Sequence, residues 1–369
     1  MSFDSRPAFA PADTHILIIG AGIAGSLLAL VLGRQGHGVT IVDPHGEPPA
    51  IFRNEKLGTE QIALLQDLGA LGCFEAACWP DGAYDGAPPS LSDCGAPHQA
   101  WLKSVRAAWT DSVTFVEDTV VAIEASATGA AITLSSGELL RGRLAVLATG
   151  RTAGLHGALG LGRDMVSVSH SACLGFSVVA DHFIPSQIHH PDFGLDIGYV
   201  SLFPMPGEVR VNIFSYRALD DAWTRRMARD PLGGLAEISP GAAQALSGAR
   251  VTRRCEVRGT DLYAATGHRR PGVVLIGDAF HAPCPASGTG MLRILHDIKL
   301  LTGQYLPMWL ETPGLDTKKV SAFYDDPQKR RLDARSLKSS LRGRQWATNR
   351  SPAWRGLRLA RRLKQLVRA

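Results

Sequence analysis

The sequence predicts an α/β fold in which a parallel sheet with helices is interrupted by an antiparallel sheet and followed by a helical tail. Three segments carry this prediction. Residues 15–43 follow the order strand, glycine turn, helix and strand, residues 199–214 alternate in polarity like a hairpin, and residues 354–367 place apolar residues among arginines at helical spacing. The 369 residues suffice for a large core and more than one structural region.

Composition narrows the class of protein. A hydrophobic fraction of 45% and a charged fraction of 20% are typical of a globular protein, and no run of about 18 apolar residues predicts a membrane-spanning helix. Residues 1–13 are polar, contain proline and lack an apolar core, so we expect a short lead-in and no signal peptide. The six cysteines form no Cys-x-x-Cys pair, which disfavours disulfides and zinc. We therefore expect a cytoplasmic protein without a metal site.

The first region opens with a strand–turn–helix–strand unit. Residues 15–19 are mostly large aliphatics and predict a buried parallel strand, residues 26–34 predict a helix, and residues 39–42 predict a second strand that ends at Asp43. A Gly-x-Gly-x-x-Gly turn, residues 20–25, joins the first strand to the helix. This context is the one that a dinucleotide-binding fingerprint requires.

Each glycine of the turn has a separate role. Gly20 permits the sharp turn, Gly22 lets a pyrophosphate approach the backbone, and Gly25 lets helix and strand pack closely. The helix N-terminus offers free N–H groups and a partial positive charge to the phosphates. Asp43 can accept both ribose hydroxyls of an adenosine and would repel a 2′-phosphate. The unit therefore predicts FAD or NAD rather than NADP.

A second segment, residues 274–291, distinguishes FAD from NAD. A buried strand runs into Gly277-Asp278, where the carboxylate can accept from a flavin ribityl hydroxyl. After a loop stiffened by two prolines, Gly288-Thr289-Gly290 opens a helix whose N-terminal dipole can stabilise negative charge on the flavin N1–C2=O edge. The two segments together predict bound FAD.

At these residues the sequence resembles the para-hydroxybenzoate-hydroxylase-like superfamily, the group A flavoprotein hydroxylases. The family pattern is Gly-Asp-Ala-x-His, then Pro-x-x-Gly-x-Gly and a helix with an early Asp. It is matched here by Gly277, Asp278, Ala279, His281, Pro285, Gly288, Gly290 and Asp297. The stretch Phe52–Gln61 also resembles a flavin-contacting segment. The residues that we expect to contact the cofactor are Gly20, Gly22, Ile23, Ala24, Gly25, Asp43, Arg53, Gln99, Val121, Gly277, Asp278, Pro285, Gly288, Thr289, Gly290 and Met291.

The resemblance implies a domain organisation and a reaction. A Rossmann-like FAD-binding domain would comprise residues 1–165 and 256–328. An inserted antiparallel sheet, which binds the substrate, would comprise residues 166–255, and a basic helical tail would comprise residues 329–369. The reaction would insert one oxygen atom of O2 into an aromatic or otherwise apolar small molecule through a flavin C4a-hydroperoxide. Because the cofactor performs the difficult step, no catalytic dyad is required, and we assign no catalytic residue.

One departure leaves the electron donor open. Where the family usually carries Asp-Gly after the strand at residues 144–148, this chain has Ala148-Thr149-Gly150. That difference leaves both NAD(P)H and a separate reductase partner as candidate donors. The alternatives to a monooxygenase are a reductase or dehydrogenase similar to the geranylgeranyl reductases and a non-catalytic FAD-binding protein. We expect His281 and Cys284 to be structural rather than catalytic.

The tail concentrates the positive charge. Residues 329–369 contain fourteen Lys or Arg and one acidic residue, a net charge of +13, so the other 328 residues carry −8 of the total of +5. The tail could dock on an anionic membrane surface, on an acidic partner such as a carrier protein bearing the substrate, or on the acidic body of the chain itself. We expect no nucleic acid, because no binding fold accompanies the charge.

Overall fold

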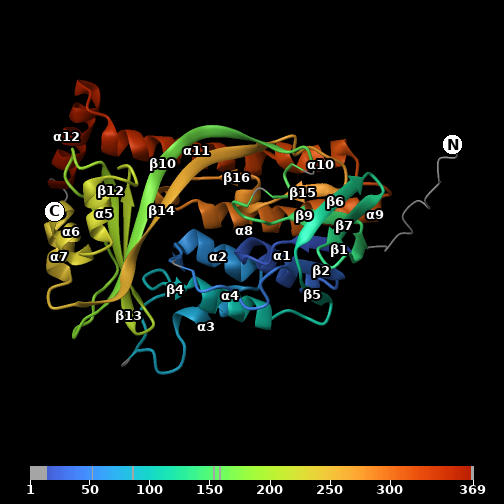
Figure 1. Cartoon of the computed structure of the whole chain (residues 1–369), viewed down its shortest axis with the longest axis horizontal. Coiled ribbons are helices and arrows are strands. Elements are labelled where there is room, and N and C mark those ends of the chain that lie inside the picture. Colours follow the sequence, from blue (N-terminus) through green and yellow to red (C-terminus); the bar gives the residue numbers. More distant parts are fainter. Residues whose placement is uncertain (1–14, 52, 85–86, 153, 158, 367–369) are drawn as a thin grey trace. The chain divides into compact units, whose positions relative to one another are not determined.

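The computed structural model describes residues 15–51, 53–84, 87–152, 154–157 and 159–366 (Figure 1). The expected lead-in at residues 1–13 and Phe52 lie outside these residues. The chain divides into two compact units. The nucleotide unit comprises Met1–Val166, Leu262–Pro283 and Gly288–Arg335, and the sheet unit comprises Ser167–Asp261, Cys284–Ser287 and Ser336–Ala369.

A five-stranded parallel sheet forms the centre of the nucleotide unit, with strand order β15-β9-β1-β2-β5. The strands are β1 (Ile16–Ile19), β2 (Val39–Asp43), β5 (Val113–Glu117), β9 (Leu144–Leu147) and β15 (Val273–Leu275). Every neighbouring pair is parallel. Strands buried on both faces need continuous apolar runs, and β1, β9 and β15 have them.

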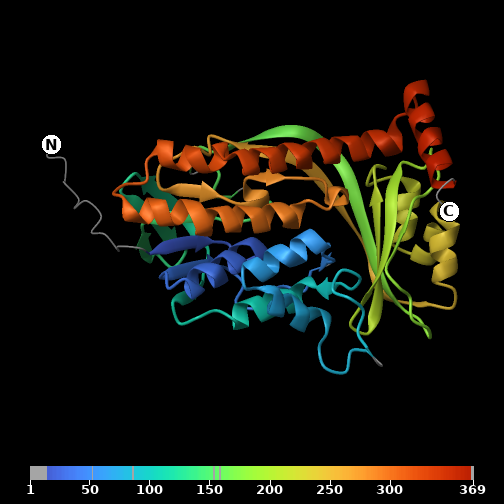
Figure 2. The same ribbon diagram turned by 180° about the vertical axis from the view of Figure 1, so that it is seen from behind.

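The two faces of this sheet pack against different partners. Ile16 and Ile18 belong to a core shared with the helices, whereas Leu17 and Ile19 belong to a second core shared with a three-stranded antiparallel sheet. That sheet is β6 (Val120–Ser126), β7 (Gly129–Leu134) and β8 (Leu139–Gly142). The helices are α1 (Ile23–Arg34), α2 (Thr59–Asp67), α3 (Leu71–Cys78), α4 (His98–Ala107), α8 (Gly290–Leu300), α9 (Leu306–Glu311) and α10 (Thr317–Asp325). Figure 2 shows α1 and α8 side by side.

The sheet unit is antiparallel, with the order β11-β12-β13-β10-β14. Its strands are β10 (Gly162–Val179), β11 (Gln187–His189), β12 (Ile197–Met205), β13 (Glu208–Ser215) and β14 (Arg250–Thr266). Three short helices, α5 (Ala222–Met227), α6 (Pro231–Ile238) and α7 (Pro240–Ala245), share a core with the sheet. The end of β14 pairs with β16 (His281–Ala282) within the nucleotide unit.

The antiparallel insertion and the helical tail confirm the predicted fold class. The hairpin expected at residues 199–214 is formed by β12 and β13, but its turn is only Pro206-Gly207, because Pro204 and Met205 still pair with β13. The long strand β14 was not predicted, because its first half is polar and exposed and shows no apolar alternation.

The tail consists of α11 (Pro327–Thr348) and α12 (Pro352–Leu366). The first part of α11 belongs to the nucleotide unit and the rest to the sheet unit. Among the residues described, no helix combines the length and the apolar character needed to cross a bilayer. None of the six cysteines, all of which lie in the described part of the chain, forms a disulfide, and five of them are buried.

Candidate cofactor and active site

Two of the three glycines in the first turn are required by close packing. Gly20 has a φ of +99°, and a β-carbon on it would lie 2.8 Å from the carbonyl oxygen of Ala148. A β-carbon on Gly25 would overlap the carbonyl oxygen of Gly20. Any side chain at either position would force the strand and the helix apart.

Gly22, in contrast, faces open space. A β-carbon there would meet no atom within 4 Å, and its φ of −70° is one that any residue can adopt. Gly22 is the N-cap of α1, and no side chain caps the helix. Since the side chains of Ile23 and Ala24 are buried, the turn offers only backbone N–H groups to a ligand. The arrangement is an anion-binding cradle.

Asp43 lies directly beside this cradle. Its Oδ2 accepts a hydrogen bond from the Ala21 N–H at 2.8 Å, and its Oδ1 accepts from the His45 N–H at 2.9 Å. Arg106 of α4 supports the same loops, donating to the carbonyl oxygens of Ala21 at 2.7 Å and Gly46 at 2.8 Å. No motif identified Arg106, because its contacts join residues 60 or more positions apart.

The second motif meets the first at Gly277. This residue has a φ of +59°, and a β-carbon on it would lie 3.5 Å from the Ala24 β-carbon of α1 and 3.2 Å from Ile294 of α8. The turn after β15 therefore lies against both helices. The two glycine-containing segments, separated by about 250 residues in the sequence, form one site.

Asp278 follows in a short 3-10 turn. Its Oδ2 accepts from Arg151 Nε at 3.3 Å, and its backbone oxygen accepts from the Tyr263 hydroxyl at 2.9 Å. Arg151 immediately follows the Ala148-Thr149-Gly150 departure from the family pattern. Sequence reasoning gave no role to Arg151 or Tyr263, since nothing in their local spacing marks them.

The N-terminus of α8 is also free of side-chain caps. Thr289 is its N-cap, and Gly288, with a φ of +64°, has open space where a β-carbon would lie. Gln61 donates to the Gly288 carbonyl oxygen at 3.2 Å. Met291 is buried, so here too the backbone would contact a ligand. Pro285 belongs to the sheet unit, in the turn Pro285–Ser287.

Three further residues that we expected to contact the cofactor, Arg53, Gln99 and Val121, lie outside the two glycine motifs. Arg53 pairs with Glu55, which also bonds to His98. Burial alone would raise the pKa of Glu55, but Arg53 and His98 together lower that pKa to about 2. Gln99 donates its amide to the Pro48 oxygen at 2.6 Å. Val121 is 54% exposed on β6.

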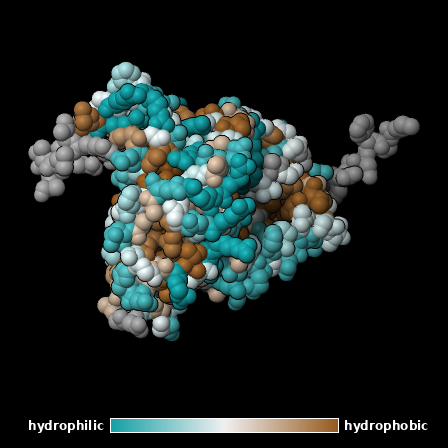
Figure 3. Space-filling view, turned by 60° about the vertical axis from the view of Figure 1, so that its left-hand side comes forward, coloured by the Kyte–Doolittle hydropathy of each residue, from teal (hydrophilic) through white to brown (hydrophobic). Residues whose placement is uncertain are grey.

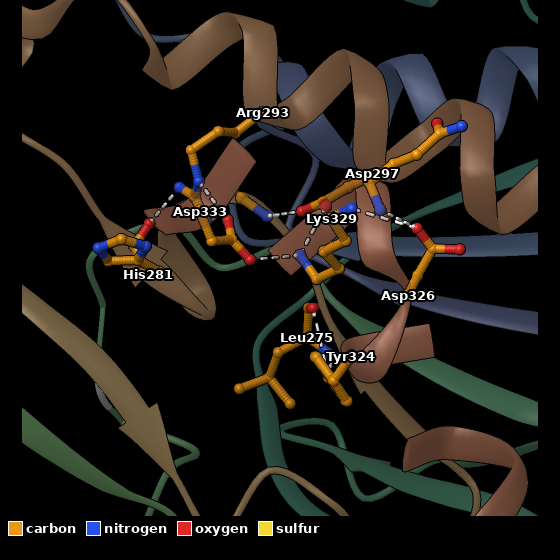
Figure 4. Close-up of polar contacts among 10 residues, drawn as sticks. Leu275, His281, Arg293, Asp297, Tyr324, Asp326, Lys329 and Asp333 are labelled. Carbon is orange, nitrogen blue, oxygen red and sulfur yellow. Dashed lines mark hydrogen bonds and ion pairs between the residues drawn. The ribbon is translucent and has the colours of Figure 1, made fainter. Parts of the chain in front are cut away.

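A buried ionic cluster lies behind the second motif (Figure 4). Lys329 of α11 donates to Asp297 Oδ1 of α8 at 2.6 Å and lies 3.4 Å from Asp333. Arg293 donates to Asp333 at 2.7 Å and to the His281 carbonyl oxygen at 2.7 Å. The cluster therefore connects the start of the tail to the segment that carries Gly277 and Asp278.

His281 lies within this cluster and stays neutral. Burial, reinforced by the positive charge of Arg293, lowers the pKa of His281 to about 4. A histidine with that pKa is uncharged at neutral pH and keeps a single ring N–H, so it does not act as a general acid. In the described part of the chain, no three His, Cys, Asp or Glu residues are grouped closely enough to hold a metal ion.

The sheet unit contains a pocket of about 590 Å³. It is lined by His190, Gly198, Tyr199, Tyr216, Ala286, Ser339, Arg342, Gly343, Trp346, Leu357 and Ala360. Tyr199 donates its hydroxyl to the Ala286 oxygen at 3.3 Å, and Ala286 precedes Gly288 by two residues in the chain. Burial raises the pKa of Tyr199 and of Tyr216, so both phenols remain protonated.

Comparison with known families matches both motif-bearing regions. Residues 13–83 match an FAD binding domain, and residues 240–331 match a squalene epoxidase family model. The chain is 24% identical over 322 residues to the ubiquinone hydroxylase UbiL of Rhodospirillum rubrum, a match that covers 78% of this chain and 71% of that protein.

Solved structures share the fold. The p-nitrophenol 4-monooxygenase of Pseudomonas putida superposes with a TM-score of 0.67 at 18% identity, covering 92% of this chain and 90% of that one. HpxO of Klebsiella pneumoniae, crystallised with FAD and uric acid, superposes with a TM-score of 0.69 at 16% identity, covering 95% and 93%.

Fold, motif geometry and family matches together define an FAD-dependent oxidoreductase. The open cradle at Gly22, the uncapped starts of α1 and α8, and the carboxylates of Asp43 and Asp278 fit the pyrophosphate, ribose and ribityl groups of FAD. These matches confirm the resemblance to the para-hydroxybenzoate-hydroxylase-like monooxygenases that the motifs predicted.

Proposed function

We propose that this FAD-dependent monooxygenase inserts one oxygen atom of O2 into an apolar, ring-containing small molecule held in the sheet-unit pocket. The observation that carries the proposal is the composition of the pocket wall. Tyr199, Tyr216 and Trp346 provide aromatic surface, and Ala286 lies in the loop that runs from Asp278 to Gly288. Pockets of this size with a mostly apolar lining and a few polar groups suit drug-sized apolar ligands.

The residues proposed to hold FAD each act on one part of it. The α1 N-terminus at Gly22 would bind the pyrophosphate, Asp43 the adenosine ribose, Asp278 a ribityl hydroxyl, and the α8 N-terminus at Gly290 the flavin N1–C2=O edge. When bound, reduced FAD supplies the electrons that activate O2. The protein contributes orientation, an apolar surrounding and the exclusion of water.

The neutral phenols limit what the pocket can bind. Because Tyr199 and Tyr216 stay protonated, they hold no negative charge, and the Tyr199 hydroxyl already donates to the Ala286 oxygen. This favours a substrate that is mostly hydrocarbon. The named relatives, a ubiquinone hydroxylase and a squalene epoxidase family, are consistent with an apolar substrate.

The test separates oxygenation from the reductase alternative. The purified protein would be reduced anaerobically, with NADH, NADPH and dithionite in separate arms, and then mixed rapidly with oxygenated buffer. We expect a transient absorbance that differs from both reduced and oxidised flavin, and one oxygen atom from ¹⁸O2 in an apolar phenol or quinone. A direct return to oxidised flavin, with no labelled product from any compound, would support the reductase. If dithionite reduces the flavin but NADH and NADPH do not, the electron donor would be a separate reductase.

A further inference from the structure

The tail carries an outward surface that the proposed reaction does not use. α12 follows α11 after a short connection, and its inward face contacts residues of the sheet unit. Trp354 contacts Trp346, with ring centroids 6.0 Å apart. Arg358, only 4% exposed, donates to the Gln345 oxygen at 3.3 Å and lies 4.6 Å over the Phe193 ring. The helix is therefore fixed in place by one face.

Large apolar side chains remain on the outside of the same helix. Leu357 is 53% exposed and Leu359 is 61% exposed, and Leu341 of α11 is 39% exposed. The space-filling view shows hydrophobic areas within a mostly hydrophilic face (Figure 3). A helix that buries an arginine and exposes leucines is not explained by packing on its own domain.

Basic side chains accompany these leucines, and residues 336–366 contain no Asp or Glu. Residues 352–366 contain five Lys or Arg and no Asp or Glu, and residues 336–351 add Lys338, Arg342, Arg344 and Arg350, again with no acid. Of these, Lys338, Arg342, Arg350 and Arg355 are exposed, and Arg350 pairs with Asp196 at 2.8 Å. An amphipathic helix with exposed leucines and only positive charges fits the interface of an anionic lipid bilayer, which offers phosphates beside hydrocarbon.

We propose that α12 docks on an anionic phospholipid surface, with Leu357 and Leu359 entering the headgroup layer and the exposed basic side chains of α11 and α12 contacting lipid phosphates. The helix also forms part of the pocket wall through Leu357 and Ala360. Docking would thus place the pocket rim at the bilayer, where an apolar substrate dissolves. That delivery role depends on the proposed function, whereas docking itself does not.

The experiment is co-sedimentation of the full-length, FAD-loaded protein with vesicles of phosphatidylcholine alone and of phosphatidylcholine mixed with phosphatidylglycerol. We expect binding to the anionic vesicles, weakened by high salt, and little binding to the neutral ones. Leu359→Glu should lower the affinity about tenfold or more, because it removes apolar burial and adds a repelled charge. The matched control is Leu139→Glu, since Leu139 is 47% exposed on β8 of the nucleotide unit and should leave binding unchanged.

Three outcomes would overturn the docking proposal. These are no sedimentation with anionic vesicles, an unchanged affinity in Leu359→Glu, or an equal loss in Leu139→Glu. Binding of an acidic protein in place of vesicles would assign the surface to a protein partner. Retained flavin absorbance shows that each variant is folded, and vesicle binding is measured without turnover. A failed docking proposal is therefore distinguishable from a failed oxygenation proposal.

Discussion

Asp297 bonds to Lys329 and to the backbone of Gly277 with its two carboxylate oxygens. Oδ1 accepts from Lys329 Nζ at 2.6 Å, and Oδ2 lies 3.4 Å from the Gly277 N–H. Both charged side chains are buried, with exposed fractions of 1% and 3% for Lys329 and Asp297. The ammonium also lies 4.5 Å from the Phe280 ring centroid. The first turns of the tail thus hold the backbone of the second FAD motif.

Replacing Lys329 with methionine should therefore be strongly destabilising. The change leaves Asp297 buried without its cation, which typically costs about 3–5 kcal/mol. We expect the free energy of unfolding, measured by urea denaturation, to fall by that amount, together with a weaker affinity for FAD. Lys338→Met, at an exposed position of the same helix, should change the free energy of unfolding by less than about 0.5 kcal/mol. Equal effects of the two variants would contradict the structural role.

Gly22 and Gly25 should respond differently to the same substitution. Gly22→Ala places a methyl group in open space, so the apoprotein should unfold at the same urea concentration as the wild type. Its FAD dissociation constant should rise about tenfold or more, because the methyl group occupies the path of the pyrophosphate. Gly25→Ala forces a β-carbon onto the Gly20 oxygen and should destabilise the apoprotein itself. A Gly22→Ala protein that binds FAD normally would rule out the proposed cradle.

His281 should make the fold sensitive to acid in a defined pH range. Its pKa falls from 6.5 in the unfolded chain to about 4 in the fold, so the unfolded state binds a proton first as the pH decreases. The stability is complete above pH 6.5 and is lost as the pH falls toward 4, by about 3 kcal/mol. His281→Gln should flatten this part of the stability–pH curve. The exposed His182→Gln variant should leave the curve unchanged.

Gly343 should control the shape of the pocket at little cost to stability. A β-carbon on it would lie 2.9 Å from the Tyr216 hydroxyl, so Gly343→Ala must displace that phenol. Because alanine favours helix by about 1 kcal/mol over glycine, the melting temperature should hold or rise. We expect KM for an accepted substrate to increase several-fold. Gly356→Ala in α12, where a β-carbon meets nothing within 4 Å, should affect neither KM nor kcat.

The local structure around the two glycine motifs was predicted correctly. The strand, turn and helix around Gly20 to Gly25 are local, because each residue's role depends on neighbours within a few positions. The same holds for the turn at Gly277, which follows a buried strand. Both segments therefore lie where the spacing placed them, and the fold brings them together.

The supporting side chains were not predictable, for a physical reason. Arg106 contacts Ala21, Arg151 contacts Asp278, and Lys329 contacts Asp297 only because the chain folds back on itself. The pocket is assembled in the same way. It combines strand residues near 199, a loop residue at 286 and helix residues beyond 339, with no periodicity that a single sequence reveals.

The tail also divides into two parts that natural variation should treat differently. Lys329 and Asp333 are tied to buried partners, so a change at either position requires a compensating change on α8. Leu357 and Leu359 contact no such partner network and are exposed. Across related chains, Lys329 and Asp297 should be conserved or replaced together. The identities of the exposed residues of α12 should instead vary with the surface that each protein contacts.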